Sequence, residues 1–343
     1  MNMWEVALMM KIDKEAYHLQ KQEEVKQLSQ MIEKGIIDCR NSDKFKNYLL
    51  QQSKMPRYSV NNCLLILAQS KGQASQVASY TTWKSLGRDV KKGEKGLKIF
   101  CPAPYKKTIA VDKKDSHGNP VLNKDGKPVY EYAEVNRVGY KPAYVFDVTQ
   151  TSGKELIEPC TKLTGDVKDY KDLMNAIKQI SPVPIFIERI EGPENGYFKF
   201  SDNDKKIVVS DQLEPLQQVK TTLHELAHAY LYENGLDNNK SREEKETEAE
   251  AISFILINNL LKDQVTPEMV GEYSFGYMAS WGDDKLTELK DCLDIIQKSS
   301  CSLIKDIESA WTNIIRQREE INQQPIQEKA ESETSEHKHH MHM

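Results

Sequence analysis

The sequence has 343 residues, of which 29% are charged and 38% apolar, and its formal net charge is −5. That length is enough for two domains of ordinary size. The longest apolar run, residues 251–261, is too short to span a bilayer, and the first 14 residues lack the basic region of a signal peptide. The sequence therefore predicts a soluble, cytoplasmic protein without a membrane partner.

Charge is distributed unevenly along the chain. Residues 51–150 hold 17 Lys and Arg against 8 Asp and Glu, a net charge of +9, whereas residues 151–343 hold 22 against 36, a net charge of −14. This split predicts that one part of the chain meets a polyanion, and a solvated charged face is the alternative. The six cysteines are scattered without a C-x-x-C pair, which predicts free thiols in a reducing compartment.

The first half reads as helices followed by strands. Apolar spacing predicts helices over 14–38 and 42–51 and a buried helix in "SVNNCLLILAQSK". A strand, "GLKIFCPAP", is predicted to end at a proline, and the Lys-rich residues 106–136 form an inserted hairpin with turns at "DSHGNP" and "NKDGKP". After the strand "AYVFDV", the composition of a linker predicts a domain boundary near 155–165.

The second half begins with a predicted helix over 170–180 and a strand, "PIFIERI". A hairpin of "GYFKF" and "KKIVVS" turns at "SDND", and helices follow over 213–232, 242–261 and 284–318, with a further helix start at Thr266 and Pro267. The predicted fold class is α+β, with two domains at 1–158 and 165–318, the second built on a small antiparallel sheet. The His-rich tail, 319–343, is predicted to be disordered.

The stretch "TTLHELAHAYLY" carries His224, Glu225 and His228 in the order H-E-x-x-H. Positions i and i+4 of a helix lie on one face, so both imidazoles can bind one tetrahedral ion. Glu225 can then accept a proton from a water on that ion as the water attacks a carbonyl. The alternative is an ordinary amphipathic helix that carries two histidines by chance.

A catalytic zinc ion needs a third protein ligand. No histidine lies between His228 and His337, so a carboxylate is expected. The acidic helix that follows offers Glu246, which lies 18 residues after His228, together with Glu248 and Glu250. We favour Glu246 as the ligand and Glu250 as a group that orients a histidine, with Glu248 as the fallback ligand. The order of sheet, H-E-x-x-H helix and glutamate helix is that of a minimal zincin.

The segments "HELAHAYLY", "KETEAEAISFIL" and "EYSFGYMASW" resemble the zinc metallopeptidase domains of ImmA/IrrE-type and ArdC-type proteins. The resemblance implies a gluzincin-type fold, Zn²⁺ held by His224, His228 and Glu246, and Glu225 as the base. The downstream Y-S-x-x-Y-x-x-W segment also matches, and packing is the expected role of its members: Tyr273, Ser274, Tyr277 and Trp281.

The basic first half contains aromatic, amide and cationic side chains of the kind that hold single-stranded DNA, where bases stack on rings and cations track phosphates. The candidates are Tyr58, Ser59, Asn62, Tyr80, Trp83, Arg88, Lys91, Lys92 and Lys95. Each has a structural alternative: Trp83 as a core residue, "KKGEKG" as a solvated turn, and Ser59 and Asn62 as caps of a helix.

The segments "YSVNNCLLILAQ", "WKSLGRDVKKGEKGLKIFCPAP" and "VFDVTQTSG" resemble the ArdC-like N-terminal single-stranded-DNA-binding domain. Together the two matching regions cover residues 14–300. A chain that combines them is similar to the antirestriction and LtrC-like proteins of plasmids and conjugative elements. They imply a protein that binds single-stranded DNA and cleaves an unknown protein substrate, which would pair with "KKIVVS" as an edge strand. The alternatives are a non-catalytic protection protein with a structural zinc, and a regulatory peptidase that cleaves a repressor.

Overall fold

A computed structural model describes residues 3–156, 167–201, 204–262 and 285–339, together with Phe275, Met278 and Gly282. The chain begins with three helices: α1 (Met3–Asp38), α2 (Ser42–Lys54) and α3 (Val60–Ser70). The side chain of Asn41 caps α2 and that of Ser59 caps α3, because each accepts a hydrogen bond from a backbone N–H of the first turn. The three helices predicted for this region are confirmed, and α1 begins before residue 14.

A long antiparallel ribbon follows, made of β3 (Leu97–Asp112) and β4 (Tyr130–Asp147). Smaller elements surround its base, the end that holds Leu97 and Asp147: β1 (Val77–Ala78), α4 (Tyr80–Ser85), β2 (Arg88–Val90), η1 (Val148–Gln150) and β5 (Thr151–Gly153). Of these, β1 pairs with β4. The inserted hairpin is confirmed, with turns closed by the N–H of Gly118 and of Gly126. The prediction that the first strand ends at a proline is wrong, because β3 runs through Pro102 and Pro104.

The edge of β3 explains why those prolines are tolerated. The Asn62 side chain donates to the carbonyl of Phe100 and accepts from its N–H, both at 2.9 Å, and Gln69 does the same for Lys98 at 2.8 Å. Backbone groups of alternate residues in a strand point to the same side, so Pro102 and Pro104 also face away from β4. No ladder hydrogen bond is lost, as is usual for proline in an edge strand.

The second half packs α5 (Val167–Ile180), α6 (Pro215–Glu233) and α7 (Arg242–Leu260) around a small sheet. Its strands are β6 (Ile185–Glu188), β7 (Gly196–Ser201) and β8 (Asp204–Ser210), in the order β6-β8-β7. The prediction of "KKIVVS" as an edge strand is wrong. This segment is β8, which lies in the centre of the sheet. It pairs with β7 in antiparallel fashion on one side and with β6 in parallel on the other.

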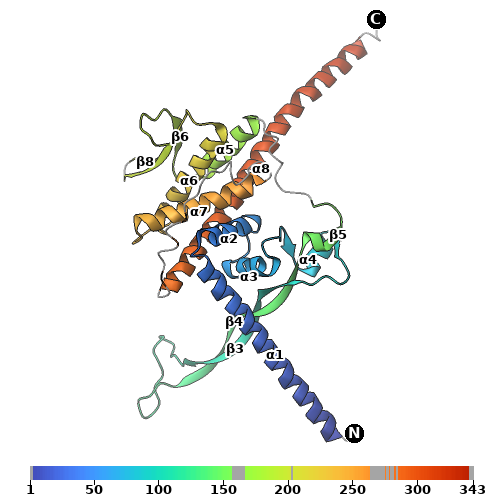
Figure 1. Cartoon of the computed structure of the whole chain (residues 1–343), viewed down its shortest axis with the longest axis vertical. Helices are drawn as coiled ribbons and strands as arrows, with labels where there is room; N and C mark the ends of the chain where they lie inside the picture. Colours follow the sequence, from blue (N-terminus) through green and yellow to red (C-terminus); the bar gives the residue numbers. More distant parts are fainter. Residues whose placement is uncertain are drawn as a thin grey trace.

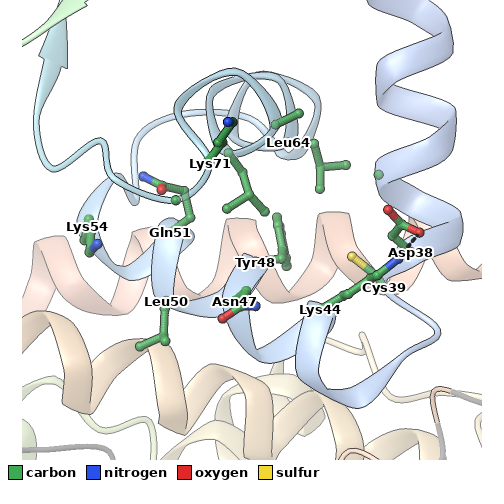
Figure 2. A pocket seen from close by; sticks show the side chains of 14 residues that line it. Asp38, Cys39, Lys44, Asn47, Tyr48, Leu50, Gln51, Lys54, Leu64 and Lys71 are labelled. Atoms are coloured by element: carbon green, nitrogen blue, oxygen red, sulfur yellow. Dashed lines mark hydrogen bonds and ion pairs between the residues drawn. The ribbon is translucent and has the colours of Figure 1, made fainter.

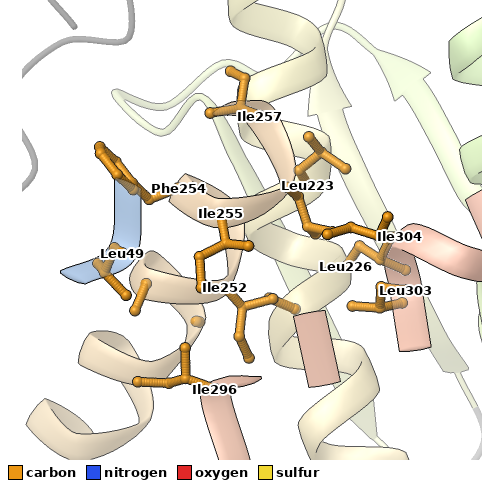
Figure 3. Close-up of a cluster of buried hydrophobic side chains, with 14 of the residues drawn as sticks. Leu49, Leu223, Leu226, Ile252, Phe254, Ile255, Ile257, Ile296, Leu303 and Ile304 are labelled. Atoms are coloured by element: carbon orange, nitrogen blue, oxygen red, sulfur yellow. The ribbon is translucent and has the colours of Figure 1, made fainter. Parts of the chain in front are cut away.

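One hydrophobic core joins both halves of the chain. Leu49 of α2 belongs to the same buried cluster as Phe254 of α7 (Figure 3). The side chain of Asn259 donates to the carbonyl of Ser53 at 2.7 Å, which ties α7 to α2. Residues from both sides of the predicted boundary therefore fold against each other, whereas residues 157–166 of the predicted linker lie outside the described residues.

The final helix, α8 (Leu286–His339), starts in the shared core and projects beyond the body (Figure 1). Its course to His339 differs from the prediction of a disordered tail from residue 319. The Glu, Gln and Lys residues that suggested disorder are also good helix formers. Thr266 and Pro267 lie outside the described residues. Within the described part of the chain, no helix combines the length and apolar character needed to cross a membrane.

Candidate metal centre and nucleic-acid interface

The helix α6 orients the H-E-x-x-H residues. Pro215 occupies its first turn, where a missing N–H costs nothing. Leu223, Leu226 and Ala227 are fully buried in the core, which fixes the rotation of the helix. His224 and His228 then lie one turn apart with their Nε2 atoms 3.2 Å from each other.

The helix α7 brings the third group to the same point. A capping box of Ser241 and Glu244 starts the helix, and Glu246 follows in its second turn. One carboxylate oxygen of Glu246 lies 3.0 Å from His224 Nε2 and the other 3.4 Å from His228 Nε2. All ligand atoms of the three residues lie within 4.8 Å of one another.

These distances fit a bound divalent metal ion. Four tetrahedral ligands at zinc distances of 2.0–2.1 Å lie about 3.3 Å from each other, close to the spacing of the imidazole and carboxylate atoms here. Hydrogen bonds from His224 and His228 hold the pKa of Glu246 far below its usual range. Burial alone would lower the pKa of His224, but the hydrogen bond with Glu246 and the charge of Glu225 outweigh it and raise that pKa.

Glu225 lies next to this cluster and is 9% exposed. Burial raises the pKa of its carboxyl, against the lowering effect of His224 and His228. The backbone N–H of Phe198 in β7 donates to the Glu225 carboxylate. A buried carboxylate with a raised pKa and a fixed orientation has the properties of a general base.

The other two glutamates occupy different positions. Glu248 is 1% exposed, and both of its oxygens accept from the Lys240 ammonium at 2.6 Å. This internal ion pair accounts for Glu248 without a metal. Glu250 lies one turn after Glu246, and its charge raises the pKa of His224. Its predicted role in orienting a histidine is compatible with that position and stays a prediction.

An aromatic cluster lies beside the candidate metal centre. Tyr232 stands one turn after His228 on α6, with ring centroids 5.8 Å from Phe198 and 5.6 Å from Phe200. The Lys205 ammonium lies 5.1 Å from the centroid of Tyr232. Phe200 is exposed, so the cluster presents an apolar surface next to the metal ligands.

Most of the residues predicted to bind DNA make contacts within the fold, and their role in DNA binding stays a prediction. Trp83 is 2% exposed and donates its Nε1–H to the carbonyl of Phe146 at 2.8 Å. Arg88 donates to Thr151 Oγ1 at 2.8 Å. The Tyr58 hydroxyl donates to the carbonyl of Val77 at 3.0 Å, Ser59 caps α3, and Asn62 bonds the edge of β3. Tyr80, Lys91, Lys92 and Lys95 remain exposed.

Replacing Trp83 with alanine tests its position in the core. We expect the free energy of unfolding to fall by about 3–5 kcal/mol, because a buried aromatic ring is removed and the Phe146 carbonyl loses its partner. Denaturant unfolding measures the change. Tyr80→Ala is the control, with an expected change within about 0.5 kcal/mol. Equal stability of both variants would place Trp83 outside the core.

A separate pocket of about 490 Å³ opens between the end of α1, α2 and α3. Lys44, Lys54 and Lys71 line this pocket together with apolar residues that include Leu64 (Figure 2). Neither the metal cluster nor a predicted DNA-binding residue lines it. The hollow therefore lies apart from both candidate sites.

The fold and the metal cluster define an α+β protein with a zincin-type peptidase domain that shares a core with an N-terminal region. Residues 20–146 match the family model described as the N-terminal domain of anti-restriction factor ArdC. Residues 179–269 match the model of the IrrE N-terminal-like domain, a peptidase M78 family. The chain therefore carries an ArdC N-terminal domain followed by an IrrE-like peptidase domain. Tyr273, Ser274, Tyr277 and Trp281 lie outside the described residues.

Two curated proteins are similar in sequence to parts of this chain. An uncharacterized pXO2 protein of Bacillus anthracis is 26% identical over 332 residues, which are 88% of this chain and 54% of the relative. The DNA primase TraC of Escherichia coli is 28% identical over 181 residues, 50% of this chain and 11% of the primase. The chain thus spans about half of the first relative and a small part of the second.

Among solved structures, the chain is similar to the antirestriction protein ArdC of plasmid R388. The metal-free form is 16% identical with a TM-score of 0.41, covering 73% of this chain and 84% of that protein. The Mn(II)-bound form is 18% identical with a TM-score of 0.42, covering 74% and 84%.

Proposed function

We propose that this chain is an antirestriction-type protein of a mobile element that binds single-stranded DNA with its first half and hydrolyses a protein substrate with its second. The observation that carries the peptidase activity is the convergence of His224, His228 and Glu246 beside the buried Glu225. The match to the IrrE-like peptidase model over the same residues supports it. The net charge of +9 over residues 51–150 and the match to the ArdC N-terminal model support the DNA-binding activity.

Zn²⁺ is the proposed ion, because two imidazoles and one carboxylate form a frequent catalytic zinc site. When bound, it would polarise the substrate carbonyl and lower the pKa of a water molecule. Glu225 accepts the proton of the attacking water and passes it to the leaving nitrogen. The N–H of Phe198 keeps the Glu225 carboxylate aimed at that water.

The edge strand β7 is the proposed place for the substrate backbone. The N–H of Phe198 reaches Glu225, so it faces away from β8. Gly196 and Phe200 then present their backbone groups on the same side, because alternate residues share an orientation. An extended peptide can pair with this edge and lay an apolar side chain on the cluster of Phe198, Phe200 and Tyr232.

A salt titration of DNA binding tests the first half of this proposal. The logarithm of the binding constant for a 20-nucleotide single strand should fall linearly with the logarithm of salt concentration, because cations on the protein displace counterions. We expect the single strand to bind more tightly than a duplex of the same length, since only unpaired bases can stack on rings. Equal binding of both, or no binding, would contradict the proposal.

A further inference from the structure

The outer part of the β3–β4 ribbon carries exposed aromatic side chains, whereas α1 lies against the ribbon's base, where Lys98 pairs with Glu24 at 2.8 Å. The ribbon projects from the body beside α1 and points away from the β6–β8 sheet (Figure 1). Tyr132 is 81% exposed and Tyr140 is 68% exposed. Alternate residues of a strand point to the same face, so all of the even-numbered tyrosines of β4 share one face: Tyr130, Tyr132, Tyr140 and Tyr144.

Packing does not explain this face. At the ribbon's base both faces meet the core, the odd-numbered face through Ile99 and Val145 and the tyrosine face through Phe100, but further out the tyrosines have no such packing. The even-numbered tyrosines belong to neither buried cluster, and Tyr144 has the Lys98 ammonium 5.9 Å from its ring centroid. Several large exposed rings on one projecting ribbon mark a surface for contact with another molecule.

The charge of the ribbon favours an anionic partner. Residues 104–141 hold eight Lys and Arg against five Asp and Glu, a net charge of +3. Three exposed cations occupy odd positions on the face opposite the tyrosines: Lys107, Arg137 and Lys141. On the tyrosine face itself Lys106 pairs with Glu134 at 3.0 Å. Neighbouring strands lie only about 5 Å apart, so a nucleic acid that curves around so narrow a ribbon can meet both faces.

The β3 edge of the ribbon does not suit pairing with a second copy of the chain. Near the base, the outward backbone groups of Lys98 and Phe100 are already bonded by Gln69 and Asn62. Further along, Pro102 and Pro104 present no N–H on the same edge. Proline and lysine on an edge strand are typical devices against strand addition. The β3 edge is therefore closed to strand addition, and the exposed rings make the face of the ribbon the favoured contact surface.

We propose that the tyrosine face of the β3–β4 ribbon is the platform on which the bases of single-stranded DNA stack, while the ribbon's cations follow the phosphates. This inference rests on the proposed binding of single-stranded DNA and moves the contact away from Trp83 and Arg88. Tyr130 and Tyr132 lie about 7 Å apart along the strand, and Tyr130 and Tyr144 about 48 Å. A face of that length accommodates several nucleotides.

The test measures anisotropy of a fluorescent 20-nucleotide oligothymidine with the full chain and two double variants. Replacing Tyr132 and Tyr140 with alanine should weaken binding at least about tenfold, because two stacking platforms are lost. Replacing the same two residues with phenylalanine should preserve binding, because the rings remain. Tyr197→Ala is the matched control, since Tyr197 is an exposed tyrosine on the other sheet. The unfolding midpoint of each variant should match that of the wild type.

The outcomes separate this inference from the proposed function. If the wild type binds and the alanine variant binds equally well, the ribbon inference is wrong and the DNA-binding proposal stands. If the wild type binds no single strand, both fail together. A third outcome is that the wild type associates with itself and the alanine variant does not, while both bind DNA equally well. The face is then a contact between copies, which also overturns the inference.

Discussion

Replacing Glu225 with glutamine should reduce protein hydrolysis by about 100- to 10,000-fold while the chain keeps its metal ion. Glutamine has nearly the shape of glutamate and can still occupy the site beside Phe198, but it cannot accept a proton from water. His224, His228 and Glu246 are unchanged by this substitution, so metal binding should remain. Hydrolysis of an unfolded protein with zinc supplied measures the first expectation, and metal analysis measures the second.

The control for this experiment is Glu243→Gln, an exposed glutamate in the first turn of α7. It should leave both hydrolysis and metal content unchanged. A Glu225→Gln protein with wild-type hydrolysis would remove Glu225 from the mechanism. If the variant keeps zinc and full protection of DNA against restriction, hydrolysis is not needed for protection, and the non-catalytic alternative holds.

Replacing Glu246 with alanine should weaken zinc binding by at least about 100-fold. Its carboxylate contacts both imidazoles, at 3.0 and 3.4 Å, and its loss leaves two nitrogen ligands, too few for a stable site. Competition with a coloured chelator measures the affinity. A chain that ends at residue 329 is used, because His337, His339, His340 and His342 can bind metal on their own.

Glu250→Gln is the informative companion to Glu246→Ala. Glu250 lies one turn further along α7, and its charge raises the pKa of His224. Glu250 is not one of the three clustered ligand residues, so the expected loss of affinity is smaller. If Glu250→Gln abolished zinc binding and Glu246→Ala did not, the assignment of the ligands along α7 would be wrong.

The sequence predicted the metal cluster because its determinants are local. The spacing of His224 and His228 within one helix sets two ligands, and the absence of another histidine before His337 left a glutamate of the next helix as the third. The capping box that positions α7 also lies within four consecutive residues.

The burial of the residues proposed to bind DNA was harder to predict, because burial depends on partners distant in sequence. Trp83 donates to a carbonyl 63 residues away, and Asn62 bonds a backbone 38 residues away. Neither partner is visible in a local pattern of basic and aromatic residues. The wrong prediction of β8 as an edge strand also comes from a distant partner. Its parallel pairing with β6 is not a contact between neighbours in a hairpin, so the local sequence does not reveal it.

One local signal was present and unused. The segment "YEYAEVNRVGYKPAY" places tyrosines at 130, 132, 140 and 144, all even positions of a strand. That alternation predicts one aromatic face, and a sequence reading that weighed it would have found the ribbon surface.

X-ray absorption at the zinc edge, on the chain ending at residue 329, tests the central claim most directly. Two imidazole nitrogens and at least one carboxylate oxygen at about 2.0–2.2 Å are expected, with one zinc ion per chain and none in His224→Ala. A shell that contains sulfur, a shell of oxygen alone, or a chain that retains no zinc would contradict the metal centre described for His224, His228 and Glu246.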